Sequence, residues 1–194
     1  MAKLYFSYAA MNAGKSTILL QASYNYRERG MRTLLFTSAL YADVEEGAIS
    51  SRLGVSSGAA LYRAGDDLFA AIAADHALKA VDCVFVDEAQ FLTPEQVWQL
   101  ARVADRLKIP VLCYGLRTDF QGKLFPGSAE LLAIADSLRE VRTICHCGAK
   151  ATMVVRRAAD GGAKTDGAQI DIEKSVYDSL CRKHWEEETG RWKA

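Results

Sequence analysis

Apolar runs alternate with stretches of helical periodicity through the first part of the chain. The run Val81–Asp87 is almost continuously apolar, and Ile109–Tyr114 resembles it. Such runs are typical of parallel strands that are buried on both faces. Two further strands are predicted, one beginning at Lys3 and one over Arg32–Thr37. Strands that alternate with helices predict an α/β fold with a parallel central sheet.

Four segments carry apolar residues at the spacing of an amphipathic helix. The first covers residues 15–29, and the second begins at Asp66, which we expect to be its N-terminal cap. The third has Thr93 as its cap and Pro94 at its first position, where proline is well tolerated. The fourth is expected over about residues 128–138.

Two long stretches lack such a pattern. Residues 38–65 are mostly small or polar, and we expect loops with little regular structure there. Residues 116–127 are predicted to form a long loop at an edge of the sheet. The later part of the chain has two short strands around a Cys-His-Cys-Gly turn, then a glycine-containing stretch and a closing segment. We therefore divide the chain into an α/β domain, 1–140, and a small lobe, 141–194.

Composition excludes several classes of protein. The chain has 24 basic and 24 acidic residues, so its formal net charge is zero, whereas proteins that hold nucleic acid polymers are usually basic. No apolar run approaches membrane-spanning length, and the N-terminal sequence does not resemble a signal peptide. We expect a cytoplasmic protein that acts on neither a membrane nor a nucleic acid polymer. A small anionic ligand remains compatible with this charge.

The segment from Lys3 to Ser16 has the layout of a phosphate-binding loop. An apolar run breaks into small residues and ends in Gly-Lys-Ser, directly before a helical pattern. A helix N-terminus favours an anion, Lys15 would reach the β- and γ-phosphates, and Ser16 would ligate Mg²⁺. Ala9 stands where the consensus has glycine, so the loop must enter by a conformation that alanine accepts, or carry strain. A plain strand–turn–helix with an exposed lysine would show the same tripeptide.

A second acidic motif follows the run that ends in Val86. Asp87 and Glu88 would emerge at the carboxyl end of a parallel strand, where ligands of α/β sheets bind. Asp87 would hold the metal ion, and Glu88 could accept a proton from a hydroxyl or water nucleophile. The alternative is a solvated acidic pair at the end of a strand. The phosphate-loop motif favours the functional interpretation.

The cysteines indicate a metal site in the lobe. Cys145 and Cys147 form one ligand pair, and Cys181 and His184 form another, which together give a Cys₃His set suited to structural zinc. His146 is a rival ligand, although its side chain would point away between two coordinating neighbours. The alternative is a set of ordinary thiols. Cys83 and Cys113 lie within strand runs and are expected in the core.

Four motifs, in order and at matching spacing, resemble those of the type II thymidine kinases, in the bacterial branch of that family. They are Ala-Met-Asn-Ala-Gly-Lys-Ser-Thr from Ala10, Val-Asp-Glu-Ala-Gln-Phe-Leu from Val86, Cys-Tyr-Gly-Leu-Arg-Thr-Asp-Phe from Cys113, and the Cys₃His set. The resemblance runs from Lys3 to about Trp185. It implies a RecA-like P-loop domain with a parallel sheet, and a zinc-binding lobe that carries a lasso loop over the nucleoside. The bacterial branch also lacks the first glycine of the phosphate loop.

The resemblance implies transfer of the ATP γ-phosphoryl group to the 5′-hydroxyl of thymidine, with Glu88 as general base and Ser16 and Asp87 at Mg²⁺. The implied ATP site comprises Ala9, Ala10, Met11, Asn12, Ala13, Gly14, Lys15, Ser16, Asp87, Glu88, Ala89 and Gln90. The implied nucleoside pocket comprises Met11, Phe91, Leu116, Phe120, Phe125 and Tyr177.

One departure from the family pattern falls in the lasso, which corresponds to 160–177. The family usually has Ile-Gly-Gly-Asn before the tyrosine, whereas this chain has Ile172-Glu173-Lys174-Ser175. The resemblance also implies a homotetramer and inhibition by dTTP. Two other functions stay open: a P-loop ATPase in which Glu88 activates water, and a nucleotide-binding or interaction protein with impaired catalysis.

Overall fold

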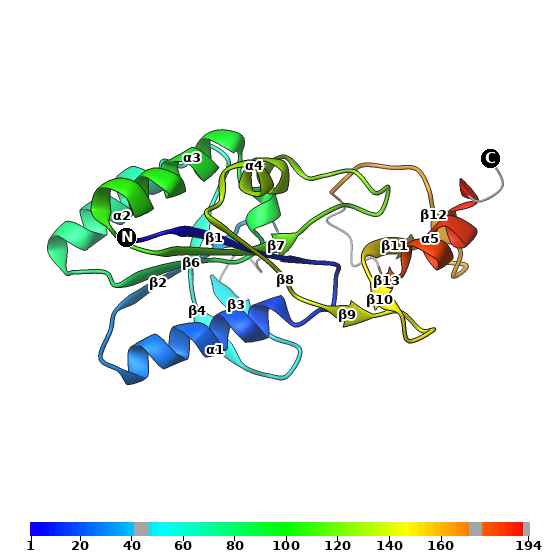
Figure 1. The fold of residues 1–194 in the computed structure, drawn as a ribbon, viewed down its shortest axis with the longest axis horizontal. Helices are drawn as coiled ribbons and strands as arrows, with labels where there is room; N and C mark the ends of the chain where they lie inside the picture. The colour runs from blue at the N-terminus through cyan, green and yellow to red at the C-terminus, as the bar shows by residue number, and fades with distance from the viewer. Residues whose placement is uncertain (41–46, 171–175, 192–194) are drawn as a thin grey trace.

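The computed structural model describes residues 1–40, 47–170 and 176–191. Among these residues, six strands form a sheet in the order β5-β2-β6-β7-β1-β8, with parallel pairing throughout. Figure 1 shows this sheet between two covering layers, with the lobe at one end. The predicted parallel α/β fold is therefore confirmed. The six strands are β1 (Leu4–Ala9), β2 (Thr33–Ser38), β5 (Ala60–Tyr62), β6 (Cys83–Val86), β7 (Val111–Leu116) and β8 (Ser137–Glu140).

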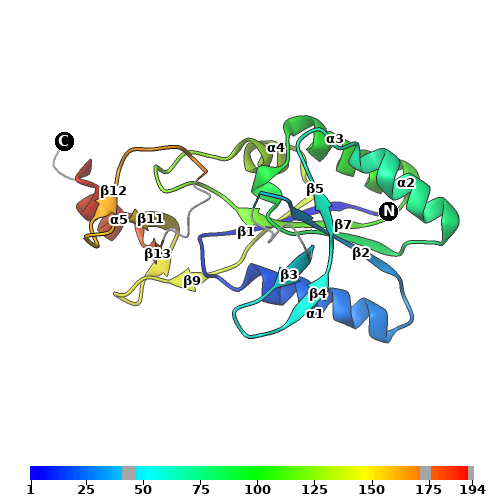
Figure 2. The ribbon, with the colours of Figure 1, turned by 180° about the vertical axis from the view of Figure 1, so that it is seen from behind.

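Helices cover both faces of the sheet (Figures 1 and 2). One face carries α1 (Lys15–Glu28), with the hairpin of β3 (Ala48–Ser50) and β4 (Ser56–Gly58) beside it. The helices on the other face are α2 (Leu68–Leu78), α3 (Pro94–Arg102), which continues into a π-helical turn η2 (Val103–Leu107), and α4 (Pro126–Ile134).

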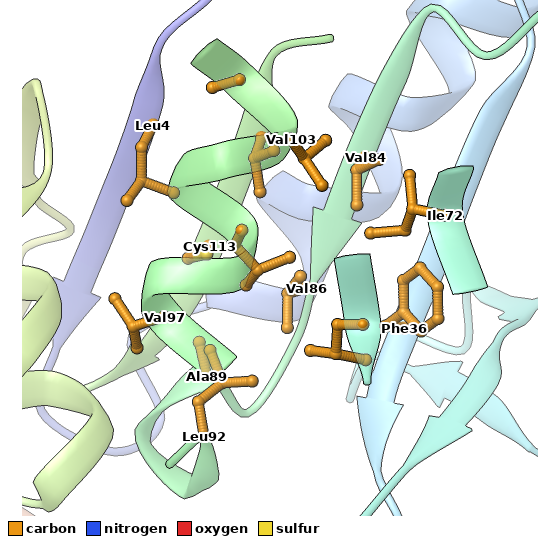
Figure 3. Close-up of a cluster of buried hydrophobic side chains, with 14 of the residues drawn as sticks. Leu4, Phe36, Ile72, Val84, Val86, Ala89, Leu92, Val97, Val103 and Cys113 are labelled. Atoms are coloured by element: carbon orange, nitrogen blue, oxygen red, sulfur yellow. The ribbon is translucent and has the colours of Figure 1, made fainter. Parts of the chain in front are cut away.

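The strand β6 is apolar throughout because its side chains are buried on both faces of the sheet. Its residues alternate between two clusters, because successive side chains of a strand point to opposite faces. Val84 and Val86 belong to the cluster under α2 and α3 (Figure 3), whereas Cys83 and Phe85 pack on the α1 side.

The helix α3 begins where the sequence predicts, with Thr93 as its cap. Thr93 Oγ1 accepts a hydrogen bond from the Gln96 amide at 3.2 Å, and Gln96 Oε1 accepts one from the Thr93 amide at 3.1 Å. This reciprocal capping box, with Pro94 at the first helical position, fixes the helix N-terminus. The predicted helix from residue 15 is also confirmed and ends at Glu28.

The predicted cap of the second helix is wrong by one residue. Asp67 caps α2, because its carboxylate accepts a hydrogen bond from the Ala70 amide at 2.9 Å. Asp66 instead accepts a hydrogen bond from the Arg63 amide at 2.7 Å and stabilises the preceding turn. Two adjacent aspartates offer equally good caps, so local sequence does not decide between them.

Two segments have more strand than expected. Within the described part of 38–65, β3, β4 and β5 replace the predicted loops, and β5 pairs with β2 at the sheet edge. The fourth helix ends at Ile134 rather than near residue 138, and β8 follows as a strand parallel to β1. These strands have only three or four residues, so pairing with a neighbour, rather than periodicity, determines them.

The lobe has its own small core. In it Val155, Leu180 and Trp185 pack beside Cys145 and Ala151. The predicted boundary at residue 140 coincides with the end of β8 and stays a prediction. No helix in the described ranges has the length and apolar character needed to cross a membrane. The lobe elements are β9 (Thr143–Ile144), β10 (Lys150–Ala151), β11 (Met153–Arg157), β12 (Ala163–Lys164), β13 (Tyr177–Leu180) and α5 (Arg182–Thr189).

Candidate active site

The phosphate loop bends at Asn12 and Gly14 rather than at Ala9. Ala9 is the last residue of β1 and pairs with Leu116, whereas Asn12 and Gly14 have left-handed backbones, with φ of 60° and 81°. Glycine adopts this conformation without cost, and asparagine visits it more readily than most residues. Ala9 therefore enters the loop as ordinary strand, and the missing first glycine causes no strain.

Lys15 lies at the start of α1 with its side chain folded back over the loop. It is buried, and its Nζ donates a hydrogen bond to the Ala10 carbonyl at 3.4 Å. Burial lowers the pKa of its ammonium group, while the nearby charges of Glu88 and Asp87 oppose that shift. The group is therefore a buried cation placed inside the loop, as phosphate binding requires.

Ser16 and Asp87 are brought together although they lie far apart in the chain. Ser16 Oγ donates a hydrogen bond to Asp87 Oδ2 at 2.8 Å. Burial, with the charge of Glu88, raises the pKa of Asp87 to about 6, and the Ser16 hydrogen bond opposes this. The Oδ1 atom of Asp87 is buried and has no hydrogen-bond partner among the described residues. A hydroxyl and an unsatisfied carboxylate oxygen suit a hard cation such as Mg²⁺.

Glu88 occupies a constrained turn. Its φ is 52°, a left-handed conformation that a non-glycine residue adopts only where its surroundings enforce it. Tyr62 of β5 donates a hydrogen bond from its hydroxyl to the Glu88 carbonyl oxygen at 2.7 Å. The 3₁₀ turn η1 (Ala89–Phe91) follows directly.

Gln90 ties the side chain of Glu88 to the neighbouring strand. Its Nε2 donates to Glu88 Oε2, and its Oε1 accepts from the Leu116 amide at 2.9 Å. Gly115 leaves space for the side-chain amide of Gln90, because a Cβ at residue 115 would lie 2.9 Å from Gln90 Oε1. The resemblance implies that Gln90 belongs to the ATP site, which stays a prediction; its described hydrogen bonds orient Glu88.

A cavity of about 480 Å³ surrounds the phosphate loop. Residues 11–17 line it, and so do residues 50–53, at the end of β3 and in the turn before β4. Glu88 and Leu116 also line it. The contribution of 50–53 was not predicted, because that segment was expected to be an irregular loop and carries no motif.

A second cavity of about 110 Å³ shares Met11, Glu88 and Leu116 with the first. All six residues predicted for the nucleoside pocket line it, and the Phe91 and Phe125 rings meet edge to face with centroids 5.7 Å apart. Glu88 thus lies where the two cavities adjoin. Further lining residues are Gln90, Thr118, Asp119, Val154 and Gln169.

Asp119 and Gln169 form a polar edge of this pocket that sequence reasoning missed. Gln169 Nε2 donates to Asp119 Oδ2 at 2.8 Å, and Asp119 Oδ1 accepts from the amides of Gln121 and Lys123 at 2.9 and 2.8 Å. The pair joins the loop after β7 to the segment before the last strand. An aspartate in a polar loop often caps a turn, which gave a weak signal for Asp119 only.

Arg156 contacts two residues that line the pocket, Phe120 and Tyr177, and the sequence did not predict this role. It is buried, and its guanidinium lies 4.0 Å from the centre of the Phe120 ring. Its Nε donates to the Tyr177 hydroxyl at 3.1 Å, and its Nη2 donates to the Ala168 carbonyl at 2.9 Å. One side chain thereby connects an aromatic wall, β13 and the segment before 171–175. The substituted lasso positions Glu173, Lys174 and Ser175 lie outside the described residues, as does Ile172 before them.

The lobe brings the four predicted metal ligands together. The ligand atoms of Cys145, Cys147, Cys181 and His184 all lie within 4.8 Å of one another. His146 is outside this set and lies ring to ring with His184, at 4.3 Å between centroids. Burial acts to raise the pKa of Cys145, but hydrogen bonds from the backbone of Cys147 and Cys181 and from His184 lower it to about 6. This environment favours the thiolate form that a metal ligand needs.

The other two cysteines have the opposite character. Cys83 and Cys113 are buried in the sheet, and burial raises the pKa of both thiols, that of Cys83 to about 12. They are core thiols, as predicted.

These features define a P-loop nucleotide-binding protein of the α/β class with a separate Cys₃His lobe. The model of the thymidine kinase family matches residues 2–185. The chain belongs to the thymidine kinase family and is therefore an ATP-dependent kinase.

Curated relatives agree over nearly their full lengths. A thymidine kinase of Mesorhizobium japonicum is 69% identical over 98% of this chain and 94% of its own. A thymidine kinase of Ruegeria pomeroyi is 63% identical over 98% of this chain and 96% of its own. Among solved structures, replication initiator DnaA bound to AMPPCP and single-stranded DNA has a TM-score of 0.42 and 19% identity, covering 73% of this chain and 40% of that one. That likeness is too distant to bear on function.

Proposed function

We propose that this kinase transfers the γ-phosphoryl group of ATP to the 5′-hydroxyl of thymidine and so forms dTMP. The observation that carries the proposal is the position of Glu88, which lines both the cavity of the phosphate loop and the smaller aromatic pocket. A residue that reaches both cavities can act on the acceptor hydroxyl beside the γ-phosphate. The substrate named for the relatives fits this arrangement.

The larger cavity would hold the triphosphate. Lys15 would contact the β- and γ-phosphate oxygens, and the backbone N–H groups of the loop would bind the rest. Ser16 Oγ and Asp87, with its unsatisfied Oδ1, would hold Mg²⁺. Mg²⁺, when bound, neutralises charge on the phosphate oxygens.

The smaller pocket would hold the nucleoside. Phe91, Phe120 and Phe125 provide apolar, aromatic walls suited to the ring and the methyl group of thymine. Asp119 and Gln169 supply a polar edge for the carbonyl and N–H groups of a pyrimidine.

Glu88 would act as the general base. The 5′-oxygen forms a bond to the γ-phosphorus, the bond from that phosphorus to the bridging oxygen of ADP breaks, and the hydroxyl proton passes to the Glu88 carboxylate. Gln90 orients this carboxylate, and the Tyr62 hydrogen bond fixes the turn that carries it.

The Cys₃His set would bind a structural zinc ion. Three thiols and one imidazole match the tetrahedral coordination that zinc adopts in closed sites. Such an ion contributes folding energy and takes no part in phosphoryl transfer. The cytoplasmic location stays a prediction from the sequence, and the homotetramer and inhibition by dTTP stay predictions that the resemblance implies.

The experiment is steady-state phosphorylation of a panel of nucleosides by wild-type enzyme and by Glu88→Gln, which keeps the size of the side chain. We expect thymidine to be the preferred acceptor and the variant to lose about 10²- to 10⁴-fold in kcat with ATP binding retained. Wild-type turnover by the variant would disprove the base assignment. ATP hydrolysis at a rate that thymidine does not change would favour an ATPase. Binding of ATP or thymidine without phosphoryl transfer would favour a nucleotide-binding protein with impaired catalysis.

A further inference from the structure

The last strand of the lobe touches the phosphate loop directly. Ser179 of β13 donates a hydrogen bond from its hydroxyl to the Met11 carbonyl oxygen. In the opposite direction, Asn12 Nδ2 donates to the Tyr177 carbonyl oxygen at 3.2 Å. The two hydrogen bonds connect adjacent residues of the loop to residues two apart on one strand, so they fix both position and direction.

These hydrogen bonds hold the phosphate loop at its left-handed residue, Asn12, and at the residue before it. Asn12 has the left-handed backbone, with φ of 60°, that turns the chain toward Gly14 and the start of α1. Met11 precedes it and lines both cavities. Hydrogen bonds that hold these two residues also set the direction of the backbone N–H groups that follow, and those groups would contact the phosphates.

The same strand belongs to the acceptor side of the site. Tyr177 lines the aromatic pocket, and its hydroxyl accepts a hydrogen bond from the buried Arg156. β13 pairs with β11, with Arg156 opposite Tyr177 and Met153 opposite Leu180. It leads directly into Cys181, a member of the Cys₃His set. The phosphate loop, the aromatic pocket and the Cys₃His set thus all involve β13 or the cysteine that follows it.

We infer that Ser179 and Asn12 are positioning residues that fasten β13 to the phosphate loop and so set the separation between the acceptor pocket and the triphosphate site. Neither residue needs to contact the reacting atoms. Ser179 acts through the Met11 carbonyl, and Asn12 acts through the backbone of Tyr177. The inference rests on the proposed function only for the identity of the acceptor, because the hydrogen bonds themselves concern the ATP side.

The test is Ser179→Ala, with Ser179→Thr as the conservative variant that keeps the hydroxyl. The matched control is Thr189→Val, which removes another lobe hydroxyl that donates to a backbone carbonyl, that of Trp185 at 2.7 Å, far from the loop. Titration calorimetry with a non-hydrolysable ATP analogue, without nucleoside, measures the donor site alone. Steady-state kinetics then separates kcat from the KM for each substrate.

We expect Ser179→Ala to bind the ATP analogue about three- to tenfold more weakly, which corresponds to one ordinary hydrogen bond, and to lower kcat as well. Ser179→Thr and Thr189→Val should bind it as the wild-type enzyme does. Wild-type analogue affinity and kcat in a folded Ser179→Ala variant would overturn the inference, as would equal losses in Thr189→Val.

A second measurement needs no variant. If β13 fastens the loop, thymidine added without ATP should slow amide hydrogen exchange at residues 12–16, although the pyrimidine contacts only the other pocket. Unchanged exchange in the thymidine-bound enzyme would contradict the inference. If thymidine does not bind at all, the proposed function fails, while the calorimetric comparison still decides the role of Ser179.

Discussion

Lys15 and Asp87 stand on the large sheet domain, whereas Tyr177 and Arg156 stand on a lobe with little core. On the sheet side, residues of β1, β6 and β7 and of three helices pack into a large apolar cluster on the α2 and α3 face (Figure 3), and a second cluster lies on the α1 face. In the lobe, the described cluster is limited to Cys145, Ala151, Val155, Leu180 and Trp185. Three of the five belong to the metal-ligand set or adjoin it in the chain: Cys145 is a member, Leu180 precedes Cys181, and Trp185 follows His184.

The lobe compensates with polar contacts to backbone atoms. The indole nitrogen of Trp185 donates to the Phe120 and Val154 carbonyls, at 3.1 and 2.9 Å. Arg156 binds backbone carbonyls in a similar way. Hydrogen bonds of this kind each contribute about 1 kcal/mol, so they orient the lobe but cannot alone order it. We therefore predict that the lobe's share of the acceptor pocket depends on a metal ion at the Cys₃His set, while the donor side depends on apolar packing.

The largest test of this difference is removal of a metal ligand by Cys145→Ser. Structural zinc contributes about 10–16 kcal/mol of apparent binding energy in small zinc peptides, far more than the lobe cluster can replace. We expect thymidine phosphorylation to be lost and amide exchange to accelerate across β11 and β13. The strands β6 and β7 should stay protected, because their core does not include the metal.

The matched control is His146→Gln, which changes the neighbouring imidazole outside the ligand set. This variant should bind zinc and keep its activity. If His146→Gln lost zinc while Cys145→Ser retained it, the ligand assignment would be wrong. If Cys145→Ser also lost protection in β6, the two halves would not be independent.

A smaller effect is expected on the sheet side from Gly127→Ala. A Cβ at residue 127 would lie 2.6 Å from the Leu92 carbonyl oxygen and 2.7 Å from that of Ala89. These are backbone atoms of the turn that follows Glu88, so they can move only by shifting that turn. Overpacking of this kind costs about 1–3 kcal/mol. Denaturant unfolding should show the loss, and kcat should fall while zinc content stays at the wild-type level.

The control for this variant is Gly65→Ala, because nothing lies within 4 Å of a Cβ at residue 65. It should leave both stability and turnover close to the wild type. A Gly127→Ala enzyme with unchanged unfolding and kcat would show that η1 can yield, and that the sheet side holds Glu88 less rigidly than the packing indicates.

Sequence patterns predicted the parts of this molecule whose determinants are local. The continuous apolar run of β6, the cap of α3 and each of the two ligand pairs of the Cys₃His set lie within a few residues. The edge strands β5 and β8 were missed because they are short, and pairing with β2 and β1 makes them strands. Propensity alone does not determine such edges.

In the candidate site, too, residues with local sequence signals could be predicted and residues that depend on distant partners could not. Its motif residues could be predicted because a phosphate loop or an acidic strand end demands particular residue types at fixed spacing. Gln169 and Arg156 could not, since their partners are distant in the chain, and Asp119 gave only the weak signal of a turn cap. Ala9 shows the reverse case, in which a departure from the motif suggested strain that the backbone at Asn12 and Gly14 avoids.

The smallest expected effect comes from Thr93→Ala, which removes one half of the capping box of α3. Loss of a threonine cap costs about 1 kcal/mol, because the Gln96 amide loses its acceptor at 3.2 Å. The denaturant midpoint should fall slightly, with kcat and zinc content unchanged, since the cluster under α3 retains its apolar contacts. Thr93→Ser, which keeps the hydroxyl, is the control and should restore the midpoint. If Thr93→Ala also released zinc or loosened β13, a cap on the sheet domain would govern the lobe, and the two halves would have to be treated as one cooperative unit.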